Sequence, residues 1–318
     1  MIVLDFILLF LFLLLLGKAA GITVENAEKL STLLNIGTFS IAFLLISFLT
    51  SLPEFAVSVV SSFSNNGEVA AGNVFGANVA DILLIFGVSA FLYKIKIRKE
   101  MINDISVAVI ITTAVSLYIF FVVLTSASLG FLEGAVLLLL FLAYVVFFKK
   151  KKEHHKAEVR TKKEAVLSFI FFLLGIVLLL VSSDLVLDYS VRIAHFFNVA
   201  TGFISASIIS IGTTLPELSV SLQAVKRKNY DIIIGTCIGS TLTNLCFVLG
   251  TALIINPITL SPPVFVPIIL FALLANLLFL CLAFVKKELR RWTGVLFIIL
   301  YIIYLATISY SQLQSINI

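Results

Sequence analysis

The feature that most constrains this chain is a series of apolar runs, each about as long as a membrane crossing. Charged residues lie almost entirely in the short segments between those runs. The hydrocarbon core of a bilayer needs about 20 apolar residues per helix. We therefore expect an all-α integral membrane protein with ten transmembrane helices. The expected spans are residues 3–17, 38–63, 67–92, 105–125, 129–148, 165–186, 202–227, 231–256, 264–285 and 292–310.

Composition excludes several classes of protein. The chain is 61% hydrophobic and 12% charged, with a mean hydropathy of +1.17, whereas soluble domains run near 45–50% apolar and about 25% charged. A soluble enzyme, a nucleic-acid-binding protein and a disordered chain are thereby excluded. The first span is short, but it carries Asp5 and lacks the basic start and small-residue cleavage site of a signal peptide. The three cysteines lie in apolar runs and predict no disulfide framework.

The distribution of Lys and Arg predicts the orientation. With ten spans, five loops face one side, and they hold all of the 22 Lys and Arg residues except Arg192. Cytoplasmic loops carry the excess of basic residues, so we expect these loops in the cytoplasm of a cell-membrane protein, with both termini outside. Residues 149–163 are expected to form a basic cytoplasmic linker that suits contact with anionic lipid. His154 and His155 in that linker could bind a metal or sense pH, but solvated loop residues are the simpler interpretation.

The chain contains an internal repeat. Residues 50–87 align without a gap on residues 213–250, an offset of 163, which places TSLPEFAVS over TTLPELSVS. The same offset aligns Gly72, Gly76 and Gly87 with Gly235, Gly239 and Gly250. Each half would hold five spans, and an odd number forces the second half to insert upside down. We expect a first repeat over 1–148 and a second, inverted repeat over 164–318, the architecture of secondary transporters with a site at the repeat interface.

Three acidic residues lie inside expected spans. Glu54 and Glu217 fall near the middle of the second and seventh spans, and Asp81 falls in the third, where the matching residue of the eighth is Asn244. An ionised side chain at the centre of a membrane helix costs about 2.5–3.5 kcal/mol on insertion scales. No Lys or Arg lies deep in any expected span to neutralise them. These acids are therefore candidate site residues rather than members of structural ion pairs.

Oxygen-bearing side chains surround these acids at helical spacing. The first set is Ser47, Thr50, Ser51, Glu54 and Ser58, repeated by Ser210, Thr213, Thr214, Glu217 and Ser221, while Asn73, Ala77 and Asp81 oppose Thr236, Ser240 and Asn244. Pro53 and Pro216 lack an N–H and should free the carbonyls of Leu49 and Gly212 for ion coordination, although a simple kink is the alternative.

Carboxylate, hydroxyl, amide and carbonyl oxygens suit hard cations such as Ca²⁺, Na⁺ and Mn²⁺. Ionised Glu54, Glu217 and Asp81 together carry three negative charges. One Ca²⁺ leaves a single negative charge, whereas three monovalent ions neutralise the site. Competition between Ca²⁺ and Na⁺ or H⁺ follows naturally from this charge.

At these residues the chain resembles the cation/calcium exchanger superfamily, and within it the prokaryotic sodium/calcium exchangers. The matching segments are TSLPE (50–54), GNVFGANVAD (72–81), GTTLPE (212–217) and GTCIGSTLTN (235–244). The resemblance implies four core helices around two glutamates, with alternating access by sliding of the first helix of each repeat. It also implies that Glu54 and Glu217 bridge Ca²⁺ and Na⁺ and that the Thr50 and Thr213 carbonyls bind Ca²⁺. The implied Na⁺ ligands are Ser51, Thr214 and Ser240 with the carbonyls of Ser47 and Ser210, and Asp81 and Asn244 flank the centre.

Several positions depart from the family pattern. Leu49 replaces a usual glycine, Ala77 replaces a serine that would bind Na⁺, and Thr236 replaces a usual asparagine. At the last position of the segments 72–81 and 235–244, the first repeat has an acid, Asp81, and the second has an amide, Asn244. Because these changes touch the Na⁺ ligands most, the counter-ion stays open, although LPE in both repeats favours the sodium branch over the proton branch.

Four functions therefore compete. The first is a Ca²⁺ antiporter driven by Na⁺, and the second is an antiporter of Ca²⁺ or another divalent cation driven by H⁺. A cation channel or ion sensor is disfavoured, because asymmetric ligands do not resemble a pore ring of identical groups. An enzyme is disfavoured because the spans offer no Ser–His, Cys–His or His-rich metal constellation. We expect a monomer in a lipid bilayer, with no cofactor besides the transported ions and no nucleic-acid partner.

Overall fold

The computed structural model describes residues 2–34, 38–125, 128–147, 162–196, 210–285 and 288–316. These residues are helical except for turns and four two-residue strands. The first half contains α1 (Ile2–Leu34), α2 (Thr38–Ile41), the π-helix η1 (Ala42–Ile46), α3 (Ser47–Thr50), α4 (Leu52–Phe63), α5 (Gly67–Val79), the π-helix η2 (Ala80–Ile85), α6 (Phe86–Leu92), β1 (Ile95–Lys96), α7 (Lys99–Thr125), β2 (Ser128–Leu129) and α8 (Phe131–Phe147).

The second half runs in the same order of elements. It contains α9 (Lys162–Phe196), α11 (Ser210–Thr213), α12 (Leu215–Lys226), α13 (Tyr230–Leu242), the π-helix η4 (Thr243–Val248), α14 (Leu249–Ile255), β3 (Ile258–Thr259), α15 (Pro262–Val285), β4 (Glu288–Leu289) and α16 (Arg291–Ile316).

Seven helices among the described residues are long and apolar enough to cross a membrane. They are Ile2–Leu30, Gly67–Leu92, Lys99–Thr125, Lys163–Ser182, Tyr230–Ile255, Pro262–Val285 and Arg291–Tyr310. An eighth candidate is the bent pair Thr38–Thr50 and Leu52–Phe63, and Phe131–Val146 is a shorter apolar helix. The chain is thus an all-α, multi-pass membrane protein. The expected seventh span is only partly described, because residues 201–209 lie outside the described part of the chain.

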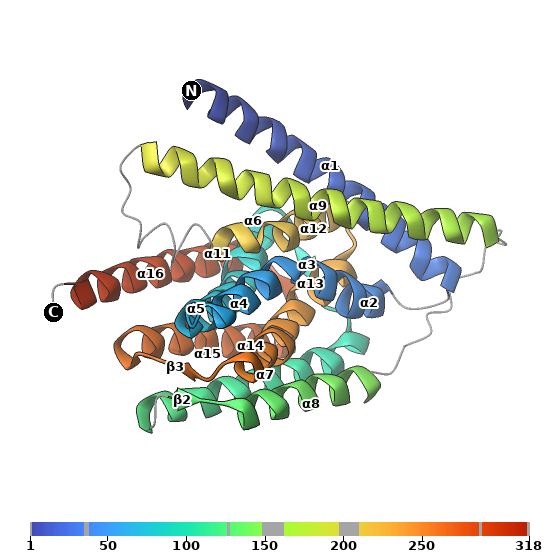
Figure 1. Ribbon diagram of the computed structural model, residues 1–318. Coiled ribbons are helices and arrows are strands. Elements are labelled where there is room, and N and C mark those ends of the chain that lie inside the picture. Colours follow the sequence, from blue (N-terminus) through green and yellow to red (C-terminus); the bar gives the residue numbers. More distant parts are fainter. Residues whose placement is uncertain are drawn as a thin grey trace.

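The first helix is much longer than the expected span of residues 3–17. The α1 helix continues through Lys18 to Leu34, because residues 18–34 are mostly good helix formers and bury Ala19, Ala20 and Val24 in an apolar cluster that includes residues of α9. The expectation was wrong because it read the end of the apolar run as the end of the helix. Figure 1 shows α1 and α9 crossing one another along one side of the molecule, with the remaining helices below them.

The same local irregularities occur in both halves at the offset of 163 residues. The π-helix Ala80–Ile85 is matched by Thr243–Val248, and the broken helix α3–α4 is matched by α11–α12. Asn65 and Lys228 occupy matching positions, and both adopt a φ of 58°. Structure as well as sequence therefore repeats, down to the turn that follows each broken helix.

Two strand pairs join the halves at opposite ends of the helix bundle. At one end, β1 pairs antiparallel with β4, Ile95 opposite Leu289, and Arg98 forms an ion pair with Asp231 at the start of α13. We call this the basic end. At the opposite end, β2 pairs with β3, Leu129 opposite Ile258. Each pair takes one strand from each half, so the two halves are fastened together at both ends.

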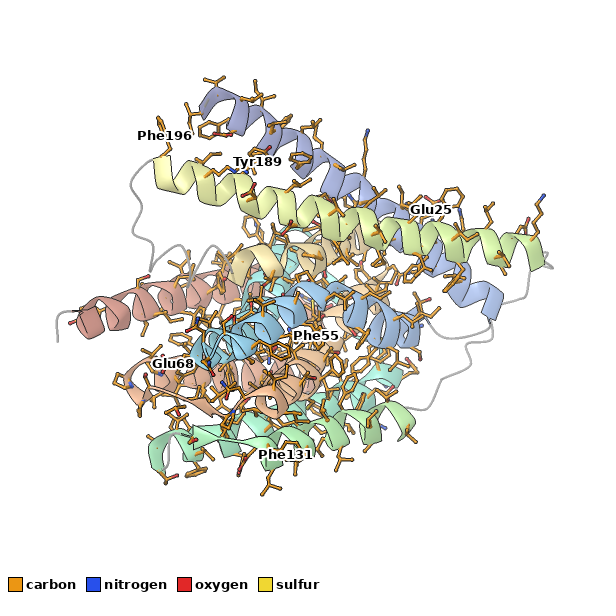
Figure 2. The ribbon with its side chains drawn as sticks, in the orientation of Figure 1. Glu25, Phe55, Glu68, Phe131, Tyr189 and Phe196 are labelled. Carbon is orange, nitrogen blue, oxygen red and sulfur yellow. The ribbon has the colours of Figure 1, made fainter. Side chains whose placement is uncertain are left out.

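The apolar interior has two parts. The larger cluster joins α5 to α8 with α13 to α16 around residues such as Phe75, Phe86 and Phe279. The smaller cluster lies between α1, α9 and the broken helices and includes Ala20, Ile46 and Phe172. Side chains such as Phe131, labelled at the periphery of Figure 2, are exposed and available to lipid. The α1–α9 pair is therefore a layer packed on the main body by its own apolar contacts.

Candidate cation site

The centre of the molecule is built on two broken helices. The first bends by about 40° at Ser51, and α4 restarts with Pro53 in its first turn. Thr214 and Pro216 repeat this arrangement before α12. Proline suits the first turn of a helix because the N–H it lacks would be unpaired there anyway. Leu49, in place of the family's glycine, therefore does not prevent the break.

The predicted release of the Leu49 carbonyl is only partial. The backbone N–H of Ser51 points to the carbonyls of both Leu49 and Ser47, at 3.1 Å from the latter. The Thr50 hydroxyl donates to the Ile46 carbonyl at 2.9 Å and lies 3.4 Å from the Ser47 carbonyl. The backbone at the break is therefore partly satisfied within its own helix.

Glu217 receives hydroxyl donors from both halves. Its Oε1 accepts from Ser51 Oγ at 3.4 Å and from Ser240 Oγ at 3.3 Å. The Glu217 side chain is 1% exposed, and its Oε2 has no hydrogen-bond partner among the described residues. The Ser51 contact therefore joins a residue of the first half to the glutamate of the second half.

Glu54 lies in a poorer environment. It is fully buried, and neither carboxylate oxygen has a hydrogen-bond partner within the described part of the chain. The residue that matches Ser240 is Ala77, which has no hydroxyl, and the residue that matches Ser51 is Thr214, whose hydroxyl donates to the Ile211 carbonyl at 3.0 Å. The difference between the two glutamates therefore follows directly from Ala77 and from the orientation of Thr214.

The third acid lies on a π-helix. Asp81 belongs to η2 and Asn244 belongs to η4, and both are buried. Both Asp81 oxygens and the Asn244 Oδ1 lack a hydrogen-bond partner among the described residues. Glu54, Glu217 and Asp81 are close enough for their charges to repel. π-helical turns commonly mark functional sites.

Asn73, also a predicted site residue, makes hydrogen bonds to two neighbouring helices. Its Nδ2 donates to the Glu54 carbonyl at 3.1 Å and to Ser58 Oγ at 3.2 Å, while its Oδ1 accepts from the Thr213 hydroxyl at 3.3 Å. Asn73 therefore connects α5 to α4 and α11, while its Oδ1 can still accept a second bond. The matching Thr236 hydroxyl is buried without a hydrogen-bond partner in the described part of the chain.

The remaining predicted residues are placed as follows. Ser47 is buried and its hydroxyl donates to the Phe43 carbonyl beside η1, whereas the side chain of Ser210 lies outside the described residues. Thr50, Ser51, Thr213, Thr214 and Ser240 are all buried. In the described residues no three His, Cys, Asp or Glu side chains gather as a ready metal cluster. Hydroxyl and carbonyl oxygens must therefore complete any cation site that the acids begin.

An aromatic cluster borders this polar centre, and sequence reasoning missed it. The Phe247 ring of η4 lies 5.2 Å from Phe48, 5.2 Å from Phe55 and 5.3 Å from Phe141, between ring centroids. Phe55 follows Glu54 directly and is labelled within the bundle in Figure 2. At the offset of 163, Phe247, Phe48 and Phe55 are matched by aliphatic Leu84, Ile211 and Leu218, whereas Phe141 is matched by Tyr304. Comparison of the two repeats at these positions is the signal that could have found the cluster.

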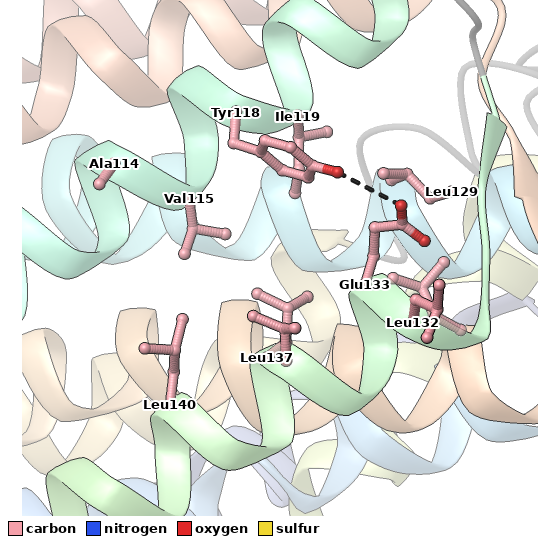
Figure 3. A pocket seen from close by; sticks show the side chains of 11 residues that line it. Ala114, Val115, Tyr118, Ile119, Leu129, Leu132, Glu133, Leu137 and Leu140 are labelled. Atoms are coloured by element: carbon pink, nitrogen blue, oxygen red, sulfur yellow. Dashed lines mark hydrogen bonds between the residues drawn. The ribbon is translucent and has the colours of Figure 1, made fainter.

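A groove of about 460 Å³ between α7 and α8 is a separate feature. Figure 3 shows its lining, which is aliphatic except for Tyr118 and Glu133. The Tyr118 hydroxyl donates to Glu133 Oε1 at 3.3 Å, and Glu133 Oε2 accepts from the Gly130 N–H at 2.8 Å. Leu132 and Val136 at its rim are exposed. The groove is apolar and faces outward, so it does not belong to the cation site.

Comparison with known proteins identifies the family. The family model described as sodium/calcium exchanger protein matches residues 4–150 and 167–310. The chain belongs to the sodium/calcium exchanger family. Both repeats and nearly the whole chain are included in the match, so the resemblance expected from the LPE segments is confirmed. Members of this family are transporters, and this exchanger-family chain is not an enzyme.

Relatives agree over most of their lengths. The putative antiporter CaxA of Alkalimonas amylolytica is 30% identical over 77% of this chain and 79% of its own. The sodium/calcium exchanger MaX1 of Methanosarcina acetivorans is 24% identical over 98% of this chain and 100% of its own. Among solved structures, the sodium-calcium exchanger NCX_Mj soaked with 10 mM Na⁺ and zero Ca²⁺ matches with a TM-score of 0.84 at 25% identity, over 96% of this chain and 99% of its own.

Proposed function

We propose that this protein is a secondary antiporter that exchanges Ca²⁺ for Na⁺ across a membrane by alternating access. The observation that supports this most strongly is the group of three buried acids at the repeat interface, most of whose oxygens have no partner among the described residues. A buried ionised group without a partner is costly. Bound cations are the natural partners for such a group, and the solved relative NCX_Mj is described as exchanging ions at a site that becomes occluded.

Glu54 and Glu217 are proposed to be shared by Ca²⁺ and Na⁺. The Thr50 and Thr213 carbonyls would complete the Ca²⁺ shell, since Ca²⁺ accepts 6–8 oxygens in flexible geometry. Ser51, Thr214 and Ser240, with the Ser47 and Ser210 carbonyls, would hold Na⁺. Asp81 and Asn244 would flank the central position, and Asn73 would act by holding α4 in place.

Proton coupling is the second candidate, and one observation favours it. Glu54 and Asp81 together present four buried oxygens that accept no hydrogen bond from the described residues. Because Ala77 removes a hydroxyl next to Glu54, the first half offers fewer oxygens for Na⁺ than the second. A proton could neutralise either acid when Ca²⁺ leaves. The transported ions are thus Ca²⁺ with Na⁺ or H⁺, and no cofactor is proposed.

The membrane arrangement proposed here has ten crossings as two inverted five-helix repeats. The basic end, with residues 94–98, 226–231 and 288–291, would face the cytoplasm under the positive-inside rule. Both termini would lie outside, and the linker over 149–163 would be cytoplasmic. We further propose that the protein resides in the cell membrane and functions as a monomer.

The test uses purified protein in liposomes. Vesicles loaded with Na⁺ are diluted into Na⁺-free buffer with radioactive Ca²⁺, while an ionophore collapses any pH gradient. Ca²⁺ uptake that requires internal Na⁺ supports the sodium-driven function. Uptake that instead requires an imposed pH gradient, and ignores Na⁺, selects the proton-driven one, and no uptake under either gradient excludes both.

The same assay tests the site. Glu54→Gln and Glu217→Gln each remove one charged ligand and should lower uptake by about 100-fold, because contacts to a charged group contribute roughly 1.5–3 kcal/mol. The matched control is Glu68→Gln. Glu68 is exposed and accepts a hydrogen bond from the Ser261 N–H near the end of the bundle opposite the basic end. Retained transport in both glutamate variants, with normal insertion, would contradict the assignment.

A further inference from the structure

Polar side chains join the C-terminal part of α1 to the turn between α12 and α13, at the basic end of the bundle. The guanidinium of Arg227 forms ion pairs with Glu25 at 3.1 Å and with Glu28 at 3.6 Å. Asn229 Nδ2 donates to Glu28 Oε1 at 2.9 Å. We call these contacts the α1 tether. Glu25 is labelled on α1 in Figure 2, where α1 and α9 run close together.

Two further contacts support the tether: one orients Glu25, and the other adds a hydrogen bond between α12 and α1. Lys29 pairs with Glu25 at 2.7 Å within α1, which holds the carboxylate toward Arg227. Nearer the middle of α1, Gln223 Nε2 donates to the Gly17 carbonyl at 3.1 Å. The contacts therefore run from Gly17 to Lys29 and connect α1 to α12 as well as to the turn that follows it.

The matching residues of the other half cannot form this tether. The pair Glu25–Lys29 does recur, as Asp188 and Arg192, which lie 2.7 Å apart on α9. Of the other partners only Asn229 recurs, as Asn66, while Arg227 is matched by Ser64, Glu28 by Val191 and Gln223 by Val60. Valine thus replaces the carboxylate of Glu28 and the amide of Gln223, and serine replaces the guanidinium of Arg227. The α1 helix is therefore tethered by charge, whereas the sequence denies α9 the equivalent contacts.

In an inverted-repeat transporter, alternating access moves one repeat against the other around a fixed site. If the repeats were identical, the two access states would be equal in energy. An interaction that only one repeat can make lowers the energy of one state. We propose that the α1 tether biases this transporter toward the access state in which α1 is docked on the α12–α13 turn, so that its two faces bind Ca²⁺ with unequal apparent affinity. This inference rests on the proposed function.

The size of the bias follows from exposure. The partners are between about a third and a half exposed, and exposed pairs are weak and screened by salt. Two such pairs with a hydrogen bond correspond to a roughly three- to tenfold preference between the states. An effect of this size changes apparent affinities measurably without locking the protein.

Two readouts separate the tether from transport. The first is backbone hydrogen exchange of residues 24–34 in nanodiscs, with choline chloride as a screening salt that the site is not proposed to carry. The second is the half-saturating Ca²⁺ concentration on each face of oriented vesicles. The variants are Arg227→Gln and the charge exchange Arg227→Glu with Glu28→Arg. The control is Arg290→Gln, which removes an exposed guanidinium that is also at the basic end and is paired with Glu288.

Arg227→Gln should speed exchange of residues 24–34 about threefold or more and change the ratio of the two Ca²⁺ concentrations by three- to tenfold. Choline chloride should reproduce the exchange effect in the wild type but not in Arg227→Gln, and the charge exchange should restore both readouts. Arg290→Gln should resemble the wild type. Unchanged exchange in Arg227→Gln, or faster exchange with an unchanged ratio, would overturn the proposal. If the wild type transports no Ca²⁺, the proposed function fails, while the exchange readout still tests the tether.

Discussion

At the scale of single residues, the two glutamates of the site are not equivalent. Glu217 Oε1 has hydroxyl donors from Ser51 and Ser240, whereas neither carboxylate oxygen of Glu54 has a hydrogen-bond partner among the described residues. Ala77 stands at the position that matches Ser240 and has no hydroxyl to donate. Since ligand number tunes cation affinity, the two halves should contribute unequally to binding.

We expect Ala77→Ser to strengthen Na⁺ coupling. Residue 77 matches Ser240, which donates to Glu217, so we expect the new hydroxyl to reach Glu54. One added oxygen should lower the Na⁺ concentration for half-maximal exchange by about three- to tenfold. Ser240→Ala should act in the opposite direction by a similar factor. Na⁺-dependent Ca²⁺ uptake measures both, and Ala90→Ser, at a buried position on α6, is the control. An Ala77→Ser protein with unchanged Na⁺ dependence would show that this position does not contact Na⁺.

At the scale of elements, the helices around the site approach one another at glycines. A methyl group on Gly239 of α13 would lie 2.6 Å from the Phe43 carbonyl oxygen and 2.6 Å from Ser47 Oγ. Close contact of α13 with η1 and α3 therefore requires glycine here. Gly72 of α5, by contrast, has no heavy atom within 4 Å of the position of such a methyl group.

Gly239→Ala should therefore destabilise the protein, and Gly72→Ala should not. Overpacking costs about 1–3 kcal/mol, whereas alanine in open space on a helix is neutral or stabilising by up to roughly 1 kcal/mol. Thermal unfolding in detergent, with transport measured beside it, distinguishes the two variants. Equal melting temperatures for both would contradict the close packing described for α13.

The sequence predicts some elements better than others. Pro53 and Pro216 indicated the two helix breaks because proline acts on the backbone directly. The π-helices leave no such signature, since the extra residue in each turn is stabilised by tertiary contacts rather than by residue type. The hydrogen bonds of Asn73 to the Glu54 carbonyl and Ser58 were not predicted either, because an amide on a polar helix face can bind an ion or a neighbouring carbonyl equally well. The end of α1 was misjudged because the residues after Lys18 are helical through packing on α9.

At the scale of the whole molecule, the two halves are joined at the basic end by a strand pair that carries charge. At the basic end, Glu288 of β4 forms ion pairs with Lys94 and Arg290. The hydrogen bond from Lys94, followed by that from Arg290, holds the pKa of Glu288 below its usual value of 4.5. A lowered pKa means that the folded state favours the ionised form, so the stabilisation is present above about 4.5 and is lost as pH falls through the lowered value.

We therefore expect the advantage of the wild type over Glu288→Gln to depend on pH. The wild type should melt at the higher temperature near neutral pH, and the difference should shrink as the pH falls below the usual range of a glutamate. Melting curves of both proteins in the same detergent measure this. A difference that stays constant, or grows, on acidification would show that the Lys94–Glu288 pair does not stabilise the junction.

Comparison of the two halves also shows which features precede the duplication of the repeat and which differences follow it. The π-helices η2 and η4, the two broken helices and the two left-handed turn residues recur at one offset. A trait held in common by two copies was present in the segment from which both were duplicated. The differences between Asp81 and Asn244, between Ala77 and Ser240, and between Glu28 and Val191 arose after duplication. The protein thus inherited its scaffold whole and acquired its one-sided features afterwards, when each copy was free to change without the other.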